Sequence, residues 1–440
     1  MRTGVKFYKN MLSSVRYNKR VFAPDGYRAE CVKKSLPRVY FVLAAIIAGL
    51  AVPLSVMLHI RKNTGTAEWW TRNIQRGWEK AIGTLTSWLP ISILEFFIVC
   101  LVILGVYLFV RLFINLCRGK FRRVLLGALS LCVGAVYVLN LYVLSMGFAY
   151  YRAEMPIPQA GEKYTQEEAT TAVLYFYEDY NRLAVKFPRD ENGCVICPYT
   201  FSELAELLVK EYDRLDDPYF NEYTPKAKPI VNSWYLSSML ITGITFLPTG
   251  EANVNVAAPP TVCTITTAHE LAHAKGVLRE GDANLLARYI LISSDNDYLR
   301  YCGYYAAFDN LMATFLLHED FTGYNTVGAG LSTLIYKERR YAYDYWQSQP
   351  DLIGKIAEFF NNLYLKANGA DNGTGSYNDG NNSDVVTPTD PETGEPERDP
   401  ETDKPVRIIN YSQVQKMFFA VYESKKIKTK NAAKFRRVFA

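Results

Sequence analysis

The chain has 440 residues, of which 49% are hydrophobic and 14% aromatic, so wholesale disorder is excluded and more than one compact part is expected. The net charge of +5 is modest and unevenly spread, which argues against a nucleic-acid-binding protein. Three of the eight cysteines fall in or beside hydrophobic segments, which leaves no dense disulfide framework.

The N-terminal third of the chain alternates basic and apolar segments. Residues 1–38 are polar and basic and are predicted to be a tail. Apolar segments follow at about residues 39–60, 91–115 and 124–146, each of a length that crosses a bilayer as one helix. Buried helices of a soluble protein are the alternative, but three such segments in one chain argue against it. We therefore expect residues 39–150 to be a membrane region.

The distribution of lysine and arginine predicts the orientation of this region. Both residues are frequent in the N-terminal tail and in the short connection 118–123. Because cytoplasmic loops carry an excess of these residues, both segments are predicted to lie in the cytoplasm. The protein is then a multi-pass protein of the cell membrane with a cytoplasmic N-terminus, and residues 151–366 form an extracytoplasmic domain.

The first half of this domain is predicted to combine helices with short strands. Apolar residues recur at helical spacing over about residues 165–186, and Thr165 with Glu168 has the spacing of a capping box. A second helix is expected at about residues 201–215. Between residues 229 and 255 the pattern changes to β-branched and aromatic residues broken by glycine and proline, which predicts short strands directly before the next helix.

A pair of histidines in residues 267–276 predicts a metal site. His269 and His273 are four residues apart, so both imidazoles project from the same face of an α-helix and can bind one ion. Only four histidines occur in the chain, which makes a chance match improbable. Zinc accepts such nitrogens and lowers the pKa of a bound water from about 15.7 to about 7. Glu270, beside the first histidine, is placed to act as the general base.

A catalytic zinc site needs a third protein ligand, and Glu280 is the candidate. Gly276 can end the first helix in the left-handed conformation, and a second helix is predicted from about residue 279 to 293. On that helix Glu280 and Asn284 share one face with small alanines, so Glu280 can reach the metal while Asn284 hydrogen-bonds a ligand. Asp282 is the competing ligand, and it points elsewhere on the helix.

Further candidate site residues lie on either side of the two helices. Residues 251–255 are the candidate edge strand, which would hold an extended substrate by main-chain pairing. Within this strand Glu251 either binds a substrate amino terminus or caps a turn, and Asn253 is a second candidate for substrate binding. Tyr301 and Tyr304 are candidates for stabilising an oxyanion, the alternative being an ordinary place in the core or an interface.

Two other motifs are not assigned to the site. Cys194 and Cys197 form an isolated C-x-x-C pair without the second pair that a structural zinc site needs, so either a local disulfide or two ordinary thiols is expected. His318, near the end of an apolar stretch, is expected to end a helix and not to bind metal.

The C-terminal part of the chain changes composition twice. Residues 367–405 are rich in Gly, Asn, Asp, Thr, Pro and Glu with few apolar residues, which predicts a disordered acidic insertion. From residue 406 apolar residues recur again, and a helix up to about residue 425 is expected to pack on the extracytoplasmic domain. A basic tail completes residues 406–440.

Four motifs together resemble the bacterial membrane-protein family "domain of unknown function 3810", over roughly residues 39–366. They are residues 249–255, the histidine helix, Glu280-x-x-Ala283-Asn284 and Arg300-Tyr301-x-Gly303-Tyr304. The resemblance implies a membrane-anchored zinc peptidase. The Glu280 motif is also similar to the third-ligand segment of glutamate-zincins such as the CAAX prenyl proteases. In those enzymes the glutamate usually lies much further downstream, and the spacing here is closer to the metzincin pattern, in which a histidine would fall at Arg279.

The sequence thus predicts a mainly α protein, with three transmembrane helices followed by an extracytoplasmic zincin-like helical domain that contains a few short strands. The predicted function is that of a zinc-dependent peptidase with Zn2+ as cofactor, anchored in the lipid bilayer and acting on a peptide or protein substrate. A non-catalytic envelope protein that contains zinc, and a hydrolase of a non-protein cell-wall amide, are the alternatives. The oligomeric state stays open.

Overall fold

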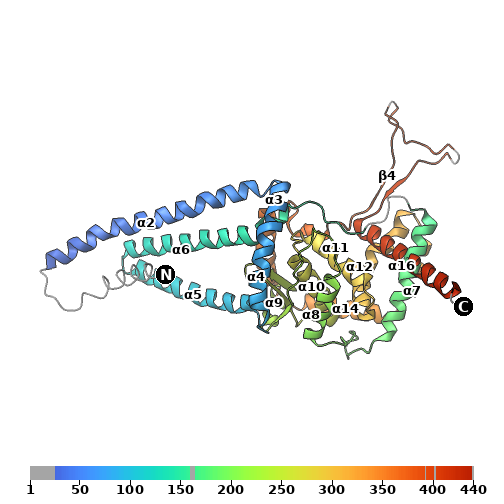
Figure 1. Cartoon of the computed structure of the whole chain (residues 1–440), viewed down its shortest axis with the longest axis horizontal. Coiled ribbons are helices and arrows are strands. Elements are labelled where there is room, and N and C mark those ends of the chain that lie inside the picture. Colours follow the sequence, from blue (N-terminus) through green and yellow to red (C-terminus); the bar gives the residue numbers. More distant parts are fainter. Residues whose placement is uncertain (1–24, 159–163, 392, 401–402, 439–440) are drawn as a thin grey trace. The chain divides into compact units, whose positions relative to one another are not determined.

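The computed structural model describes residues 25–158, 164–391, 393–400 and 403–438 (Figure 1). The chain is mainly helical with a few short strands, as predicted. It divides into two compact units, one formed by Met1–Val56 and Gly105–Asn140 and the other by Met57–Leu104 and Leu141–Ala440. The second unit contains all the residues predicted to form the functional site.

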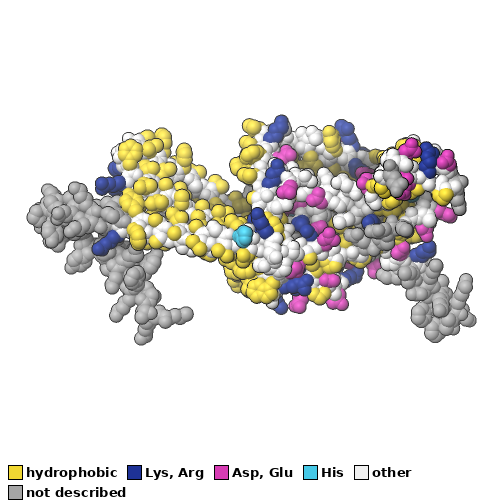
Figure 2. Space-filling view, turned by 90° about the horizontal axis from the view of Figure 1, so that it is seen from above, with side chains coloured by type: hydrophobic (Ala, Val, Ile, Leu, Met, Phe, Trp, Pro, Cys, Tyr) yellow, Lys and Arg dark blue, Asp and Glu magenta, His cyan; other side chains and the backbone are white. Residues whose placement is uncertain are grey.

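Three helices among the described residues are long and apolar enough to cross a membrane. They include Arg38–Ile60 of helix α2 (Asp25–Ile60), all of α5 (Ile93–Cys117), and α6 (Phe121–Tyr142) with the π-helical turn η2 (Val143–Gly147) that continues it. Their apolar side chains are mostly exposed, as expected of helices surrounded by lipid and not by protein. Figure 2 shows this surface, where hydrophobic side chains dominate. The structure thus has a long apolar helix at each of the three predicted segments, to within a few residues, and their length and composition indicate a membrane protein.

The segment between the first two of these helices is folded into the second unit. It forms α3 (Thr64–Trp70), the π-helical turn η1 (Thr71–Gln75) and α4 (Arg76–Ser87). The buried carboxylate of Glu79 on α4 accepts a hydrogen bond of 2.6 Å from Asn221, and Glu68 on α3 pairs with the buried Arg152. Buried polar groups of this kind are costly unless they are paired, so these contacts fix the segment against the rest of the unit.

The helical core of the second unit is built from α10 (Pro260–Ala274), α11 (Glu280–Ser293) and α12 (Asp297–Leu317), which pack on one another, and α7 (Gln166–Lys186), which packs on α12. The capping box of Thr165 and Glu168 is present at the start of α7, as predicted. Further helices of this unit are α8 (Phe201–Tyr212), α9 (Ser233–Ser238), α13 (Phe321–Gly330), α14 (Thr333–Gln347) and α15 (Asp351–Ala367).

A three-stranded sheet lies beside α10. Its strand order is β1 (Lys228–Ile230), β3 (Glu251–Asn255), β2 (Gly243–Phe246), with β1 parallel and β2 antiparallel to β3. The expectation that residues 251–255 form an edge strand is wrong, because β3 is the central strand and β2 lies at the edge in the described part of the chain. All five residues of β3 are buried, which is typical of a strand that is covered on every side.

The segment 367–405, predicted to be a disordered insertion, contains regular structure. The 3-10 turn η4 (Gly373–Asn378) packs against α11 and α15, and β4 (Asp384–Val386) pairs with β5 (Ile408–Asn410). Its polar residues find hydrogen-bond partners on α11, so order here does not require burial of apolar side chains. The final helix α16 (Gln413–Val438) confirms the other prediction for this region, because the periodic residues Val414, Met417, Phe418 and Val421 are all buried.

Candidate metal centre

Helices α10 and α11 bring together the three residues predicted to bind metal. The Nε2 atoms of His269 and His273 lie 3.2 Å and 3.4 Å from Oε2 of Glu280, and one potential ligand atom from each residue lies within 4.8 Å of the others. The chain turns back between the two helices at Gly276, whose φ of +89° is the left-handed conformation expected there. The local pattern of the sequence therefore predicted the arrangement of these three side chains correctly.

Hydrogen bonds on the far side of each imidazole orient the two histidines. Nδ1 of His269 lies 2.8 Å from Oδ1 of Asn284, and Nδ1 of His273 lies 2.7 Å from the carbonyl oxygen of Val277. The amide NH2 of Asn284 donates to the carbonyl of Tyr377, which identifies Oδ1 as the atom facing His269. Since both partners of the Nδ1 atoms are acceptors, each Nδ1 carries a proton and the Nε2 atoms face Glu280.

The electrostatics of this cluster fit a divalent cation. Oε2 of Glu280 is buried and has no hydrogen-bond partner. Burial raises the pKa of Glu280, but the two histidines outweigh it and hold the pKa at about 2. Burial lowers the pKa of His273, while the Glu280 carboxylate raises it more, to about 9. Without a cation the cluster therefore retains a proton, and two nitrogens with one carboxylate oxygen form a ligand set that zinc accepts.

Glu270 lies next to this cluster but is held by the sheet. Its side chain is buried, and Oε2 accepts a hydrogen bond of 2.7 Å from the hydroxyl of Thr245 on the edge strand β2. Gly243, on the same strand, has no room for a side chain, because a Cβ there would lie 2.5 Å from Oε1 of Glu270. Burial raises the pKa of Glu270, and the neighbouring histidines offset this only in part. A carboxylate with a raised pKa is suited to accept and return protons near neutral pH.

Asp282, the competing ligand, lies outside the cluster. Its carboxylate pairs with Arg279, with Nε and Oδ2 2.6 Å apart. Two residues along a helix correspond to a rotation of about 200°, so Glu280 and Asp282 face in nearly opposite directions. The geometry favours Glu280 over Asp282 as the third ligand.

Four other predicted site residues have structural partners elsewhere. Glu251 is buried, accepts hydrogen bonds of 3.0 Å from the backbone N–H groups of Ile93 and Leu94 at the start of α5, and pairs with Lys228 at 2.6 Å. It therefore has the capping role that was the alternative to substrate binding. Asn253 is buried in the sheet and donates to the carbonyl of Ile244 at 3.2 Å.

The two candidate oxyanion-stabilising tyrosines are core residues. The hydroxyl of Tyr301 donates to Glu338, and that of Tyr304 donates to Asp179 at 2.9 Å. Both side chains are fully buried. Their hydroxyl groups thus already have hydrogen-bond partners in the interior. Both tyrosines have the ordinary place in the core that was the alternative to stabilising an oxyanion.

The tyrosines that do approach the cluster were not predicted. The Glu280 carboxylate contributes to raising the pKa values of Tyr150, Tyr364 and Tyr377, after burial, which is the larger cause. The hydroxyls of Tyr150 and Tyr364 lie 2.5 Å apart, and Tyr377 is fixed through its backbone carbonyl by Asn284. Tyr377 belongs to the turn η4, whose low-complexity sequence offered no pattern that places it near the histidines.

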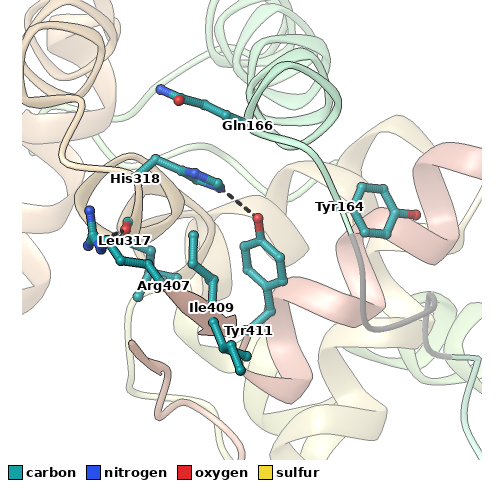
Figure 3. Close-up of a pocket in the computed structure, with 8 residues that line it drawn as sticks. Tyr164, Gln166, Leu317, His318, Arg407, Ile409 and Tyr411 are labelled. Atoms are coloured by element: carbon teal, nitrogen blue, oxygen red, sulfur yellow. Dashed lines mark hydrogen bonds between the residues drawn. The ribbon is translucent and has the colours of Figure 1, made fainter. Parts of the chain in front are cut away.

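The two motifs that were not assigned to the site lie outside the metal cluster. Cys194 and Cys197 are free thiols, one of the two expected states. His318 follows the last residue of α12, as predicted, and its Nε2 lies 2.7 Å from the hydroxyl of Tyr411 (Figure 3). These two residues line a groove of about 500 Å³ with Gln166 and Arg407, and it shares no residue with the metal cluster.

Comparison with known proteins gives one match. The profile of the family described as "Protein of unknown function (DUF3810)" matches residues 70–380. This range includes the second and third membrane helices, the sheet, the metal cluster and η4, and it leaves out the first membrane helix and α16. No curated protein and no solved structure matches the chain.

Proposed function

The chain belongs to the family "Protein of unknown function (DUF3810)", and from its metal cluster we propose that it is a membrane-anchored zinc-dependent peptidase. The observation that carries this proposal is the convergence of His269, His273 and Glu280, each of which offers one potential ligand atom within 4.8 Å of the others. In the cation-free protein the buried charge of Glu280 is offset by a proton on the histidines, and a cation bound among the three side chains would take the place of that proton. Three protein ligands leave a fourth position of a tetrahedral zinc ion open, as catalytic sites require.

Zinc, when bound, supplies Lewis acidity that polarises a carbonyl group and makes water nucleophilic near neutral pH. His269, His273 and Glu280 would hold the ion, while Asn284 and the carbonyl of Val277 keep the imidazoles oriented. Glu270 would take the proton from the attacking water and give it to the leaving amine, for which its raised pKa is suited.

The edge strand β2 supports a peptide as the substrate. Among the described residues β2 pairs with β3 alone, so its outer edge keeps backbone groups available to an extended chain. Glu270 lies directly against Gly243 of this strand, so a substrate paired there would bring its backbone close to the general base. This gives β2 the role that the sequence analysis assigned to residues 251–255.

The orientation in the membrane is a further part of the proposal. The second unit of the chain, which contains the cluster, also contains one end of each membrane helix, namely Ile60, the start of α5 and the end of η2. The basic connection 118–123 lies at the other end of α5 and α6. By the excess of basic residues in cytoplasmic loops, the metal cluster would then be extracytoplasmic.

Metal analysis together with a Glu270→Gln variant tests the proposed activity. The purified full-length protein and the variant are both expected to contain one zinc ion, and only the wild type is expected to cleave members of a peptide library. Asp282→Asn is the matched control, because Asp282 pairs with Arg279 and should affect neither zinc content nor cleavage. Equal results for wild type and Glu270→Gln would support a non-catalytic zinc protein. Cleavage confined to cell-wall fragments would support the hydrolase of a non-protein amide.

A further inference from the structure

Helix α15 exposes an apolar face that a soluble helix would bury. Leu352 is 72% exposed and Phe359 64% exposed, although large apolar side chains of a surface helix normally point into the protein. The exposed apolar residues of this helix are Leu352, Ile353, Ile356, Phe359, Phe360 and Leu363. Contiguous exposed patches of this kind mark binding surfaces for protein or for membrane.

The spacing of these residues shows that the exposed face is a single stripe. Successive members of this set are one or three residues apart, which places them on one side of an α-helix. The opposite side packs against the protein through Gly354 and Leu365, which are both buried. Lys355 and Lys366 lie on the flank between the two sides, and the exposed Glu358 lies beside Leu365 on the side opposite the stripe. Helix α15 thus has two apolar sides, one that packs on the protein and one that faces its surroundings.

The end of α15 is tied to two membrane helices. Arg61 directly follows the first of them, and its buried guanidinium donates to the carbonyl of Ala367 at 2.8 Å and to the side chain of Asn368 at 3.1 Å. The same guanidinium lies 3.5 Å from the carbonyl of Gly147, the last residue of the third membrane helix. The C-terminal turn of α15 is therefore fixed where these two helices leave the membrane.

The start of α15 lies near the remaining membrane helix. A Cβ at Gly354 would lie 2.7 Å from Leu240, the residue that follows the C-cap of α9. The chain just before α9 is held by Glu95 in the first turn of α5, which accepts hydrogen bonds of 2.9 Å from the backbone N–H groups of Val231 and Asn232.

Exposed aromatic side chains lie just before α5 and on α9. Trp88, just before α5, is 73% exposed, and Trp234 on α9 is 67% exposed. Tryptophan is enriched where the polar headgroups of a bilayer meet its hydrocarbon core. The chain next to the first turn of α5 and on α9 therefore has the composition of a membrane interface.

These three helix ends lie on the same side of a membrane. No membrane helix lies between Ile60 and Ile93, and two lie between Ile93 and Gly147, so all three ends emerge together. Helix α15 has 17 residues and is about 26 Å long. Its first turn is connected through α9 to the start of α5, and its last turn is bonded to Arg61, which also contacts Gly147. A helix attached in this way lies along the membrane surface.

We propose that α15 is an interfacial helix, which lies along the membrane with Leu352, Phe359, Leu363 and their neighbours inserted among the lipids. An amphipathic helix with large apolar residues on one side and lysines at its flank is typical of this placement. The turn η4 packs on α15 and on α11, which carries Glu280, so a single turn of chain separates the interfacial helix from the metal cluster. This inference rests on the proposed peptidase function where it concerns the substrate, which would be a polypeptide segment close to the lipid surface.

Quenching by brominated lipids tests the placement of α15 independently of any activity. An environment-sensitive fluorescent amino acid is introduced at Phe359 or Leu363 of the full-length protein, which is reconstituted in vesicles with brominated acyl chains. The matched control is the same probe at Glu358, which is exposed on the side of the same helix opposite the stripe, and a second control is Asn192 in an exposed turn. The two apolar positions are expected to lose most of their emission, and Asn192 none.

The comparison between positions decides the outcome. Strong quenching at Phe359 and Leu363 with weaker quenching at Glu358 supports an interfacial helix. Absence of quenching at both apolar positions overturns the proposal, including the case in which a second copy of the chain covers the stripe. A peptide tethered to a lipid should be cleaved faster than the same peptide in solution. A lack of cleavage of both would refute the peptidase and leave the quenching result unaffected.

Discussion

Replacing Asn284 by alanine tests whether the hydrogen bond behind His269 supports the metal site. The substitution removes the acceptor 2.8 Å from Nδ1 of His269, so the ring loses the partner that fixes both its rotation and its tautomer. Loss of such an outer partner typically lowers metal affinity about 10- to 100-fold, which corresponds to about 1.4 to 2.7 kcal/mol. We expect the zinc dissociation constant to rise by this factor, because His269 loses its fixed orientation while His273 and Glu280 keep theirs.

The measurement is a titration of the purified protein against a chromogenic zinc chelator at constant pH. Asn284→Asp is the matched control, because it keeps an acceptor for His269, while a carboxylate oxygen replaces the amide that donates 2.9 Å to the carbonyl of Tyr377. Its affinity is expected to stay within a few-fold of wild type. If Asn284→Ala binds zinc as tightly as wild type while His273→Ala does not bind it, the imidazole of His269 does not depend on this partner and the reasoning is refuted.

Two further predictions concern the metal cluster, and a third concerns the structural ion pair of Glu251. Gly243→Ala should displace the Glu270 carboxylate, since the new Cβ would lie 2.5 Å from Oε1. A shift of about 1 Å is expected to lower kcat about 100-fold while zinc is retained. An unchanged kcat would contradict the contact. Because the cation-free cluster keeps a proton on His273 up to a pH of about 9, zinc binding at pH 7 should release about one proton, and zinc affinity should fall as the pH is lowered. Calorimetry in buffers of different ionisation enthalpy measures the number of protons released. Zinc binding without proton release would contradict the prediction. Glu251→Ala should destabilise the fold by about 3 to 5 kcal/mol by leaving Lys228 buried and unpaired, seen as a lower unfolding midpoint; a higher KM with unchanged stability would instead indicate substrate binding.

The part of the site that the sequence predicted is the part that is local in the chain. His269, His273 and Glu280 lie within twelve residues, and helical periodicity together with Gly276 determines how their side chains converge. The same holds for the membrane helices, whose length and composition are properties of continuous segments. No knowledge of distant contacts was needed for either prediction.

The errors concern contacts between distant segments. Strand order in a sheet depends on which segments pair, and neither the composition of residues 251–255 nor that of residues 243–246 reveals which one takes the centre. Glu251 was predicted at the site because it precedes the histidine helix, but its partners Ile93 and Lys228 come from other elements. Tyr301 and Tyr304 were chosen by proximity in sequence, whereas their helix directs both hydroxyls into the core.

The low-complexity segment shows why composition alone misjudged residues 367–405. A polar chain stays disordered when it cannot bury enough apolar surface to offset the lost conformational entropy. Here the compensation comes from hydrogen bonds to side chains of a helix that is already folded, through Asn284 to the carbonyl of Tyr377 and through Arg288 to Asn381. Since Asn284 also holds His269, the order of η4 and the orientation of a metal ligand depend on the same side chain. A change that displaces Asn284 should therefore disturb both the turn and the orientation of His269, although no residue of the turn belongs to the three-residue cluster.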